Sequence, residues 1–396
     1  IKPREIILLA EVQGGGGYVI LTLSEEAEPG QEEPFRISCF LAPTLPQDLI
    51  RQHVVTDLPE FLKVAASSAS LDVIVSVRSG TGLAPKFYDA VLRPLLGILG
   101  LQEKKSEDVS AAGEPSYRVT VTQDANTVKD FPREKWGPDA ASKSTVLLLS
   151  GDGGVVDLLN SGVALPSPGS SHLLPTVVLL PLGTGNALFH SLHKPHYTTT
   201  TTTSPGDLLP PPPPPPPDTP AYRQHGDKRF GMVAQELLRD LHGYEVEVVT
   251  APSGRLVVAG GKGGGGGGGG AGGAGGAGGF NYVLATMVSN LEKTFTISPD
   301  SRPLDGKLRL VHFGGKSGEE TMAIMMAAYG GGKHVGMAGV GYQQEDEVRL
   351  TSLERDARWR KVCVDGTIVE LAEGGTMDVK TDQEPRLNIV FLDATT

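Results

Sequence analysis

Cysteine is almost absent from this sequence: only Cys39 and Cys363 occur in 396 residues. Two cysteines cannot build a disulfide framework or a cysteine-rich zinc site, which excludes small domains held together in either way. Long apolar runs are absent too, because the longest, Leu173–Leu182, contains two prolines and is too short to cross a bilayer. These absences favour a protein of a reducing compartment, and we expect it in the cytoplasm.

Basic residues are outnumbered by acidic ones. The chain has 35 Lys and Arg against 46 Asp and Glu, which gives a formal net charge of −11. A domain dedicated to nucleic acid presents a basic face to the phosphates. We therefore expect no nucleic-acid partner.

Several catalytic signatures are also missing. No glycine-rich loop completes G-x-G-x-x-G, because Pro85 and Val156 stand where the last glycine is required. The sequence contains no HRD, DFG or HExxH motif, and its nine histidines show no metal-ligand spacing. Dinucleotide-dependent dehydrogenases, protein kinases and zincin proteases are thereby disfavoured, and no metal site built from side chains alone is predicted.

Two low-complexity tracts separate segments of ordinary composition. Eight consecutive prolines, residues 210–217, lie in a stretch rich in threonine and proline, which predicts a semi-rigid spacer that an SH3- or WW-type partner could also bind. A glycine tract occupies residues 258–279, and we expect it to be disordered. The predicted organisation is a strand-rich region of unknown role (1–67), an α/β domain (68–196), a Thr/Pro linker (197–221) and a β-rich domain (222–396) that contains the glycine tract.

Strand, glycine-rich loop and helix alternate in the predicted α/β domain. The first unit is the buried strand Leu71–Val77 followed by the helical pattern Ala84–Leu99. Further strands are predicted at Tyr117–Val121, Thr145–Leu149 and Thr176–Leu180, with helices at Lys129–Trp136, Val155–Ser161 and from Ala187. This alternation is typical of a parallel sheet, which binds ligands at the carboxyl ends of its strands.

Short strands dominate both remaining regions. Before residue 68 they are predicted at Glu5–Ala10, Tyr18–Leu23 and Phe35–Leu41. After a helix at Met232–Leu241, they are predicted at Glu245–Thr250, Tyr282–Ser289, Leu308–Phe313, Val348–Leu353, Lys361–Val364, Ile368–Leu371 and Arg386–Phe391. The spacing of the second set predicts an antiparallel β-sandwich or a barrel-like domain.

Glycine loops follow three of the predicted parallel strands. They are SGTG (79–82), SGDGG (150–154) and PLGTGN (181–186). Glycine lets the backbone approach a ligand closely, and amide groups at a helix N-terminus bind anions. Asp152 would repel a phosphate there unless it binds a metal or accepts a proton. For one loop alone, a left-handed turn with Asp152 as a helix cap is the better explanation. Three loops on one sheet reverse that preference and favour a phosphate site.

At these residues the chain resembles the catalytic domain of the diacylglycerol kinase and sphingosine kinase superfamily. The resemblance rests on SGDGG with Asp157 and Asn160, on PLGTGNAL, and on SGTGLAPKFYDAVLRPLL (79–96). It extends through YRQHGDKRF (222–230), LEKTFTISPDSRPLDGKLRLV (291–311) and VDG (364–366). It implies an α/β nucleotide-binding domain of the NAD kinase/diacylglycerol kinase-like kind, followed by an antiparallel β-sandwich. The combination of motifs is most similar to sphingoid long-chain-base kinases.

The resemblance also implies roles for individual residues. Asp152 would accept the proton of the lipid hydroxyl. The nucleotide-binding positions are Ser79, Gly80, Thr81, Gly82, Thr122, Ser150, Gly151, Gly153, Gly154, Gly183, Thr184, Gly185, Asn186, Arg223, Arg229, Asp365 and Gly366. The two arginines would meet the ATP phosphates with their planar, permanently charged guanidinium groups.

The chain departs from the family pattern at three places. Ser76-Val77 replaces an Asn-Pro pair, and Thr367 replaces the last Glu of an Asp-Gly-Glu element. The acidic residue expected to bind the lipid head group falls on Pro216, which leaves Asp218 as a substitute. The predicted function is an ATP- and Mg²⁺-dependent lipid kinase acting on the primary hydroxyl of a sphingoid base, with transient membrane contact. A diacylglycerol or ceramide kinase and an inactive nucleotide-binding homologue are the alternatives.

Overall fold

The computed structural model divides the chain into two compact units. The first comprises Ile1–Leu182 with Arg386–Val390, and the second comprises Gly183–Pro385 with Phe391–Thr396. The structure describes residues 5–12, 16–25, 34–64, 69–104, 115–136, 143–162, 173–197, 238–256, 279–302, 304–382 and 384–391. Residues 198–221 of the predicted linker, residues 258–278 of the glycine tract, and the candidate residues Asp218, Arg223 and Arg229 lie outside the described residues.

The first unit begins with a four-stranded sheet. Its elements are β1 (Ile6–Glu11), β2 (Tyr18–Glu25), β3 (Phe35–Ala42), α1 (Gln47–His53) and β4 (Val54–Val55). The strand order is β3-β2-β1-β4, with antiparallel pairing except between β1 and β4. The three strands predicted before residue 68 are confirmed. The ring of Phe35 in β3 packs edge-on against the ring of Phe87, with 5.1 Å between the ring centroids.

A six-stranded parallel sheet forms the centre of the first unit. It contains β5 (Ala69–Val75), β6 (Gln102–Glu103), β7 (Ser116–Val121), β8 (Lys143–Ser150), β9 (Thr176–Pro181) and β19 (Asn388–Val390). The order is β19-β9-β8-β5-β7-β6, and every neighbouring pair is parallel. The prediction of a parallel α/β sheet is therefore confirmed.

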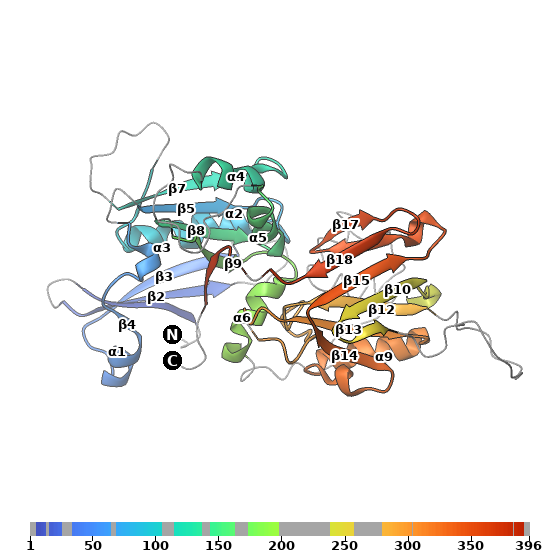
Figure 1. Ribbon diagram of the computed structural model, residues 1–396. Helices are drawn as coiled ribbons and strands as arrows, with labels where there is room; N and C mark the ends of the chain where they lie inside the picture. Colours follow the sequence, from blue (N-terminus) through green and yellow to red (C-terminus); the bar gives the residue numbers. More distant parts are fainter. Residues whose placement is uncertain are drawn as a thin grey trace, which may run out of the picture. The chain divides into compact units, whose positions relative to one another are not determined.

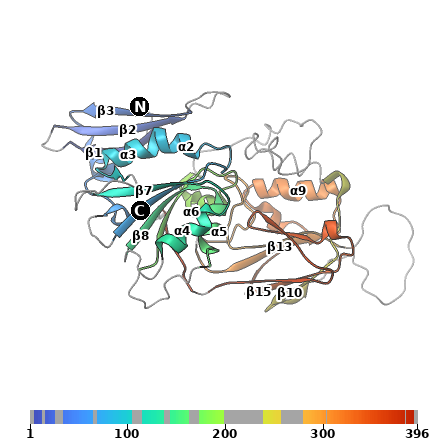
Figure 2. The same cartoon turned by 90° about the horizontal axis from the view of Figure 1, so that it is seen from above.

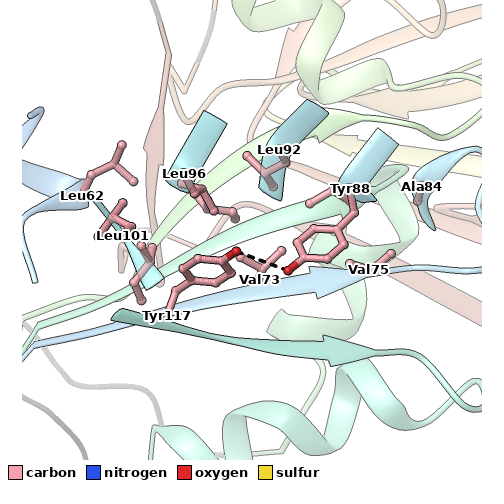
Figure 3. Close-up of a cluster of buried hydrophobic side chains, with 12 residues drawn as sticks. Leu62, Val73, Val75, Ala84, Tyr88, Leu92, Leu96, Leu101 and Tyr117 are labelled. Carbon is pink, nitrogen blue, oxygen red and sulfur yellow. Dashed lines mark hydrogen bonds between the residues drawn. The ribbon is translucent and has the colours of Figure 1, made fainter. Parts of the chain in front are cut away.

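One helical segment lies between the two sheets (Figures 1 and 2). It consists of α2 (Ala84–Phe87), a π-helical turn (Tyr88–Leu92) and α3 (Arg93–Ile98). Figure 3 shows its buried side chains, Tyr88, Leu92 and Leu96, packed on Val73 and Val75 of β5. The phenol of Tyr88 donates to Glu103 at 2.9 Å and lies 3.4 Å from that of Tyr117. The buried residues of this segment, Tyr88, Leu92 and Leu96, recur every four positions and form part of the main core of the unit.

Two further helices cover the other face of the parallel sheet. They are α4 (Thr127–Lys135) and α5 (Asp152–Leu159), and Lys129 and Asp157 form an ion pair between them at 3.6 Å. Directly after α4, Trp136 donates its indole N–H to Ser144 of β8 at 3.0 Å. Each helix follows a parallel strand, so its N-terminus lies at the carboxyl edge of the sheet.

The second unit is built from antiparallel strands. One sheet has the order β11-β10-β15-β18, a second has the order β12-β13-β14, and β16 pairs with β17 alone. The strands are β10 (Val246–Ala251), β11 (Gly254–Leu256), β12 (Phe280–Thr286), β13 (Leu308–Gly314), β14 (Val340–Glu345), β15 (Glu347–Ser352), β16 (Lys361–Val364), β17 (Thr367–Glu370) and β18 (Thr376–Lys380). Val248 and Val348 of the first sheet pack against Leu308 and Leu310 of the second. The predicted antiparallel sandwich is confirmed.

The structure of the second half differs from the sequence-based expectation at two places. The strand predicted at Arg386–Phe391 does not join the sandwich, because β19 pairs with β9 in the first unit. A helix, α9 (Gly318–Tyr329), stands between the predicted strands Leu308–Phe313 and Val348–Leu353, where no element was predicted. Helix α6 (Ala187–Tyr197) belongs to the second unit.

The end of the predicted helix Met232–Leu241 is only a 3₁₀ turn at Leu238–Asp240, and its first six residues lie outside the described residues. None of the helices in the described part of the chain is both long and apolar enough to cross a membrane.

We expect a histidine without solvent contact to make the second unit sensitive to acid. His334 is fully buried, its Nε2 lies 3.0 Å from the carbonyl of Ile297, and its Nδ1 has no hydrogen-bond partner. Burial lowers the pKa of His334 below the ordinary value of 6.5, and it also lowers the pKa of His312 in β13. Below that ordinary pKa the unfolded chain takes up the proton before the folded chain, so the free energy of unfolding falls.

We predict that His334→Gln reduces this acid sensitivity. The amide keeps a donor for Ile297 but does not titrate, which removes up to about 1.4 kcal/mol of destabilisation for each pH unit below the ordinary histidine pKa. Urea unfolding at about pH 7.5 and about pH 5.5 measures the difference. His53→Gln, at an exposed site in the first unit, is the control. Equal losses of stability in wild type and His334→Gln would contradict the prediction.

Candidate functional site

The carboxyl ends of four parallel strands, β7, β5, β8 and β9, are held side by side by backbone hydrogen bonds. Thr122, after β7, donates its amide to Val75 at 3.0 Å, and Ser76, after β5, donates to Leu149 at 3.0 Å. Leu182, after β9, donates to Ser150 at 3.2 Å. The pairing therefore continues past each strand, and the segments that follow start from one edge of the sheet.

The first glycine loop is a pair of tight turns. Ser79 donates its amide to Ser76, and Gly82 donates to Ser79 at 2.8 Å. Gly80 and Gly82 have φ angles of 55° and 77°, in the left-handed region that disfavours side chains. The glycines of SGTG are thus required by the turn itself, as the simpler of the two sequence interpretations proposed.

The hydroxyl of Ser79 joins this loop to the second one. It donates to the Ser76 hydroxyl at 3.0 Å, lies 3.1 Å from the Ser150 hydroxyl, and accepts the amide of Gly151 at 3.3 Å. Ser79 was predicted to contact the nucleotide. Its observed contacts give it a second task, which is to fix the distance between the two loops.

The second loop leads directly into a helix. Helix α5 begins at the half-buried Asp152, and no side chain caps its N-terminal end. The first amide groups of a helix have no partner within it, and the helix dipole favours negative charge there. This end of α5 is therefore suited to an anion, with the carboxylate of Asp152 on the first residue of the helix.

The two glycines after Asp152 have different surroundings. A Cβ on Gly154 would lie 2.6 Å from Ser150 Oγ, 2.8 Å from Ser150 Cβ and 3.3 Å from Leu148 Cδ1. A Cβ on the exposed Gly153 would meet nothing within 4 Å. Packing within the fold therefore explains Gly154 but leaves Gly153 unexplained, and the close approach of a ligand would account for it.

The segment after β7 supports the first loop. Thr122 is buried, and its hydroxyl accepts the amide of Val77 at 3.0 Å. The carboxylate of Asp124 accepts hydrogen bonds from the amides of Asn126 and Thr127 at the start of α4 and from the Thr127 hydroxyl. These hydrogen bonds, that from Asn126 first, lower the pKa of Asp124.

Sequence reasoning missed a basic residue in the first loop. Arg78 is exposed, and it is paired with no carboxylate of the described residues. Its charge makes a smaller contribution to the lowered pKa of Asp124. An unpaired guanidinium beside a glycine loop is a second reason to expect a phosphate there. The signal that would have found it is the basic side chain placed directly before SGTG.

The third predicted loop belongs to the second unit. In the turn Gly183–Asn186 the Asn186 side chain accepts the amide of Gly183 at 3.0 Å and donates to its carbonyl at 2.9 Å. Asn186 adopts a φ of 52°, and α6 starts at the next residue. A Cβ on Gly185 would lie 3.0 Å from the carbonyl of Leu291. This turn is thus a rigid cap at the start of α6.

Asp365 and Gly366 form the exposed turn between β16 and β17. Their φ angles are 46° and 85°, as a two-residue hairpin turn requires. Hairpin geometry accounts for both residue types, and their predicted nucleotide contact stays a prediction. Among the described residues, no group of three or more His, Cys, Asp or Glu side chains is placed to hold a metal ion.

No protein-family model and no curated protein matches this chain. Similar solved structures include a diacylglycerol kinase from Bacillus anthracis str. Sterne, with a TM-score of 0.44, 10% identity, and coverage of 83% of this chain and 98% of that chain.

Two further structures from that organism are named as candidate diacylglycerol kinases. Their TM-scores are 0.47 and 0.49, and their identities are 10% and 11%. They cover 82% and 84% of this chain and 97% and 99% of their own. The function proposed below rests on the chain's own residues.

We predict opposite effects of alanine at the two glycines of α5. Gly154→Ala should destabilise the first unit by about 1–3 kcal/mol, because the new methyl group overlaps Ser150. Gly153→Ala should be neutral or stabilising by up to about 1 kcal/mol, because alanine favours a helix and the site is open. Urea unfolding distinguishes them, and equal destabilisation would contradict the described position of α5.

Proposed function

We propose that this chain is an ATP-dependent lipid kinase that phosphorylates the primary hydroxyl of a sphingoid long-chain base. The observation that carries the proposal is the Ser79 hydroxyl, which ties two glycine loops together beside the N-terminus of α5. This arrangement holds backbone amides and one carboxylate at the same edge of a parallel sheet.

The residues of the first unit fit the phosphates of ATP. Gly80 and Gly82 form tight turns, Gly153 leaves open space, and the N-terminus of α5 supplies amide groups. Backbone amides of this kind bind phosphate oxygens without a side chain. Arg78 would add a positive charge that offsets the charge developing on the transferred phosphoryl group.

Asp152 would act as the general base. In the proposed step the lipid hydroxyl oxygen attacks the γ-phosphorus of ATP, its proton passes to the Asp152 carboxylate, and the bond from the γ-phosphorus to the β–γ bridging oxygen breaks to release ADP. The first turn of α5 would hold the phosphate oxygens during this transfer. Placement of a base and a phosphate cradle on consecutive residues fixes their mutual geometry.

Magnesium would reach the site together with the nucleotide. The described residues contain no cluster of three metal-binding side chains, but Mg²⁺ commonly uses substrate phosphates with only one or two carboxylates. Because Asp152 is assigned to the proton, the phosphates of ATP would be the main ligands of the ion. When bound, Mg²⁺ supplies charge neutralisation for the phosphates.

The choice of a sphingoid base rests on the sequence pattern SGDG followed by Asn160 and LPLGTGNAL. A substrate of this kind resides in a bilayer, so we also propose transient membrane contact. Because the chain is acidic, attraction to anionic lipid head groups would contribute little, and contact through apolar side chains is the simpler arrangement.

We predict that Asp152→Asn lowers the turnover number for a sphingoid base by about 10²- to 10⁴-fold, the usual contribution of a general base. ATP binding should be retained, because the amide groups of the loops are unchanged. ATP-dependent phosphorylation of sphingosine, diacylglycerol and ceramide in mixed micelles provides the measurement.

Asp89→Asn is the matched control. Asp89 is an exposed carboxylate on the helical segment after the first loop. Among the described residues it forms an ion pair with Arg93 alone, at 3.2 Å, and an exposed pair of this kind contributes little to stability. The lipid kinase activity of Asp89→Asn should equal that of wild type. Full activity of Asp152→Asn would reject Asp152 as the general base. Faster turnover of diacylglycerol or ceramide than of sphingosine would reject the sphingoid base as the substrate. ATP binding by wild type without turnover of any of these lipids would reject the proposal that the chain is a kinase.

A further inference from the structure

Strand β3 forms one edge of the four-stranded sheet in the first unit. The order β3-β2-β1-β4 gives β3 a single neighbour among the described strands, and Figure 2 shows it at the outer edge of that sheet. Its pairing with β2 continues without a bulge from Phe35 to Ala42. A long and regular strand edge of this kind is a template on which another strand can pair.

The register shows which backbone groups of β3 point away from β2. In an antiparallel pair, residues that exchange backbone hydrogen bonds alternate with residues that do not. Val12 donates its amide to Gly17 between β1 and β2, and counting along the register from this pair directs Ile20 and every second residue of β2 towards β3. Arg36, opposite Ser24, therefore faces β2, and its carbonyl also accepts the Ser24 hydroxyl at 3.4 Å. The backbone groups that point outward are those of Phe35, Ile37, Cys39 and Leu41.

This edge lacks the features that commonly prevent pairing between sheet edges, which are charges, prolines and bulges. Between Phe35 and Ala42 the single charged residue is Arg36, and no proline interrupts the strand. Leu41 is 76% exposed and Phe40 is 43% exposed, although both side chains are large and apolar. Two neighbouring apolar side chains exposed on an open edge are typical of a surface that a partner covers.

We infer that β3 pairs with β3 of a second copy of this chain, in antiparallel orientation. A two-fold axis at Ser38 places each outward-pointing residue opposite another one. Phe35 then pairs with Leu41 of the second copy, and Ile37 pairs with Cys39 in the same way, so that all four residues exchange backbone hydrogen bonds. The two four-stranded sheets become one continuous sheet of eight strands.

The sequence of β3 is complementary to itself in this register. An axis shifted by one residue to Cys39 would place Phe35 opposite Pro43, which has no amide to donate. In the proposed register Arg36 lies opposite Phe40 of the second copy, so no like charges meet and the guanidinium can stack on the exposed ring. A second copy supplies this complementarity without any other protein, and two-fold dimers are the commonest symmetric assemblies. The inference does not depend on the proposed kinase activity.

Sedimentation equilibrium of the full-length chain tests the inference. At micromolar concentrations wild type should show a mass of about twice 41.6 kDa, and this mass should fall on dilution. Leu41→Lys places a charge on the edge and should weaken dimerisation by about tenfold or more. Ile98→Lys changes a side chain that is 51% exposed on α3 of the same unit, and it should leave dimerisation unchanged. A monomeric wild type throughout this range, or equal dimerisation of Leu41→Lys and wild type, would overturn the inference.

An engineered disulfide tests the register. With both native cysteines replaced by alanine, Ser38→Cys places two thiols at the axis, in a pair without backbone hydrogen bonds. The Cα atoms of such a pair lie about 4.5 Å apart, within the range of a disulfide. Oxidation should therefore give a covalent dimer. Arg36→Cys in the same background is the control, because its two copies would lie about 14 Å apart along the strands. A failure of Ser38→Cys to cross-link, or equal cross-linking of Arg36→Cys, would contradict the proposed pairing.

Discussion

The hydroxyl of Ser79 is the contact on which the geometry of the candidate site depends. It meets Ser76 within its own loop and both Ser150 and the Gly151 amide across the sheet. These contacts form only because β5 and β8 are paired in register, with Val75 opposite Leu149. Parallel pairing of β5 and β8 therefore sets the distance between the two loops. The Ser79 hydroxyl maintains this distance beyond the ends of the strands.

The core below the loops makes this edge rigid. The segment α2–α3 packs Tyr88, Leu92 and Leu96 on β5, and Gly154 brings α5 against Ser150 without room for a side chain. Close packing of this kind leaves the backbone few alternative positions. The loops are thus placed in advance, which suits phosphoryl transfer, where catalysis consists mostly of positioning and charge stabilisation.

The centre of the first unit was largely predictable from sequence because β5, β8 and β9 are mostly apolar runs that lead into glycine loops. The sequence did not show which strand pairs with the segment Arg386–Phe391. The residues of a short apolar strand do not specify the sheet to which it belongs. Helix α9 was missed although Ser317 and Glu320 form a capping box that marks its start. The glycines of the site were found from their spacing, but the supporting hydroxyl contacts of Thr122 and Ser79 depend on tertiary contacts that no local pattern reveals.

The central claim is that the α5 loop binds nucleotide phosphates, and the affinity of Gly153→Ala for a non-hydrolysable ATP analogue tests it most directly. The added methyl group meets no protein atom, so a loss of binding would report the ligand itself. Gly97→Ala on α3, which is equally open, is the control. The account predicts that calorimetry finds binding weakened by about tenfold or more for Gly153→Ala. The affinity of Gly97→Ala should equal that of wild type. Unchanged affinity in Gly153→Ala would contradict it.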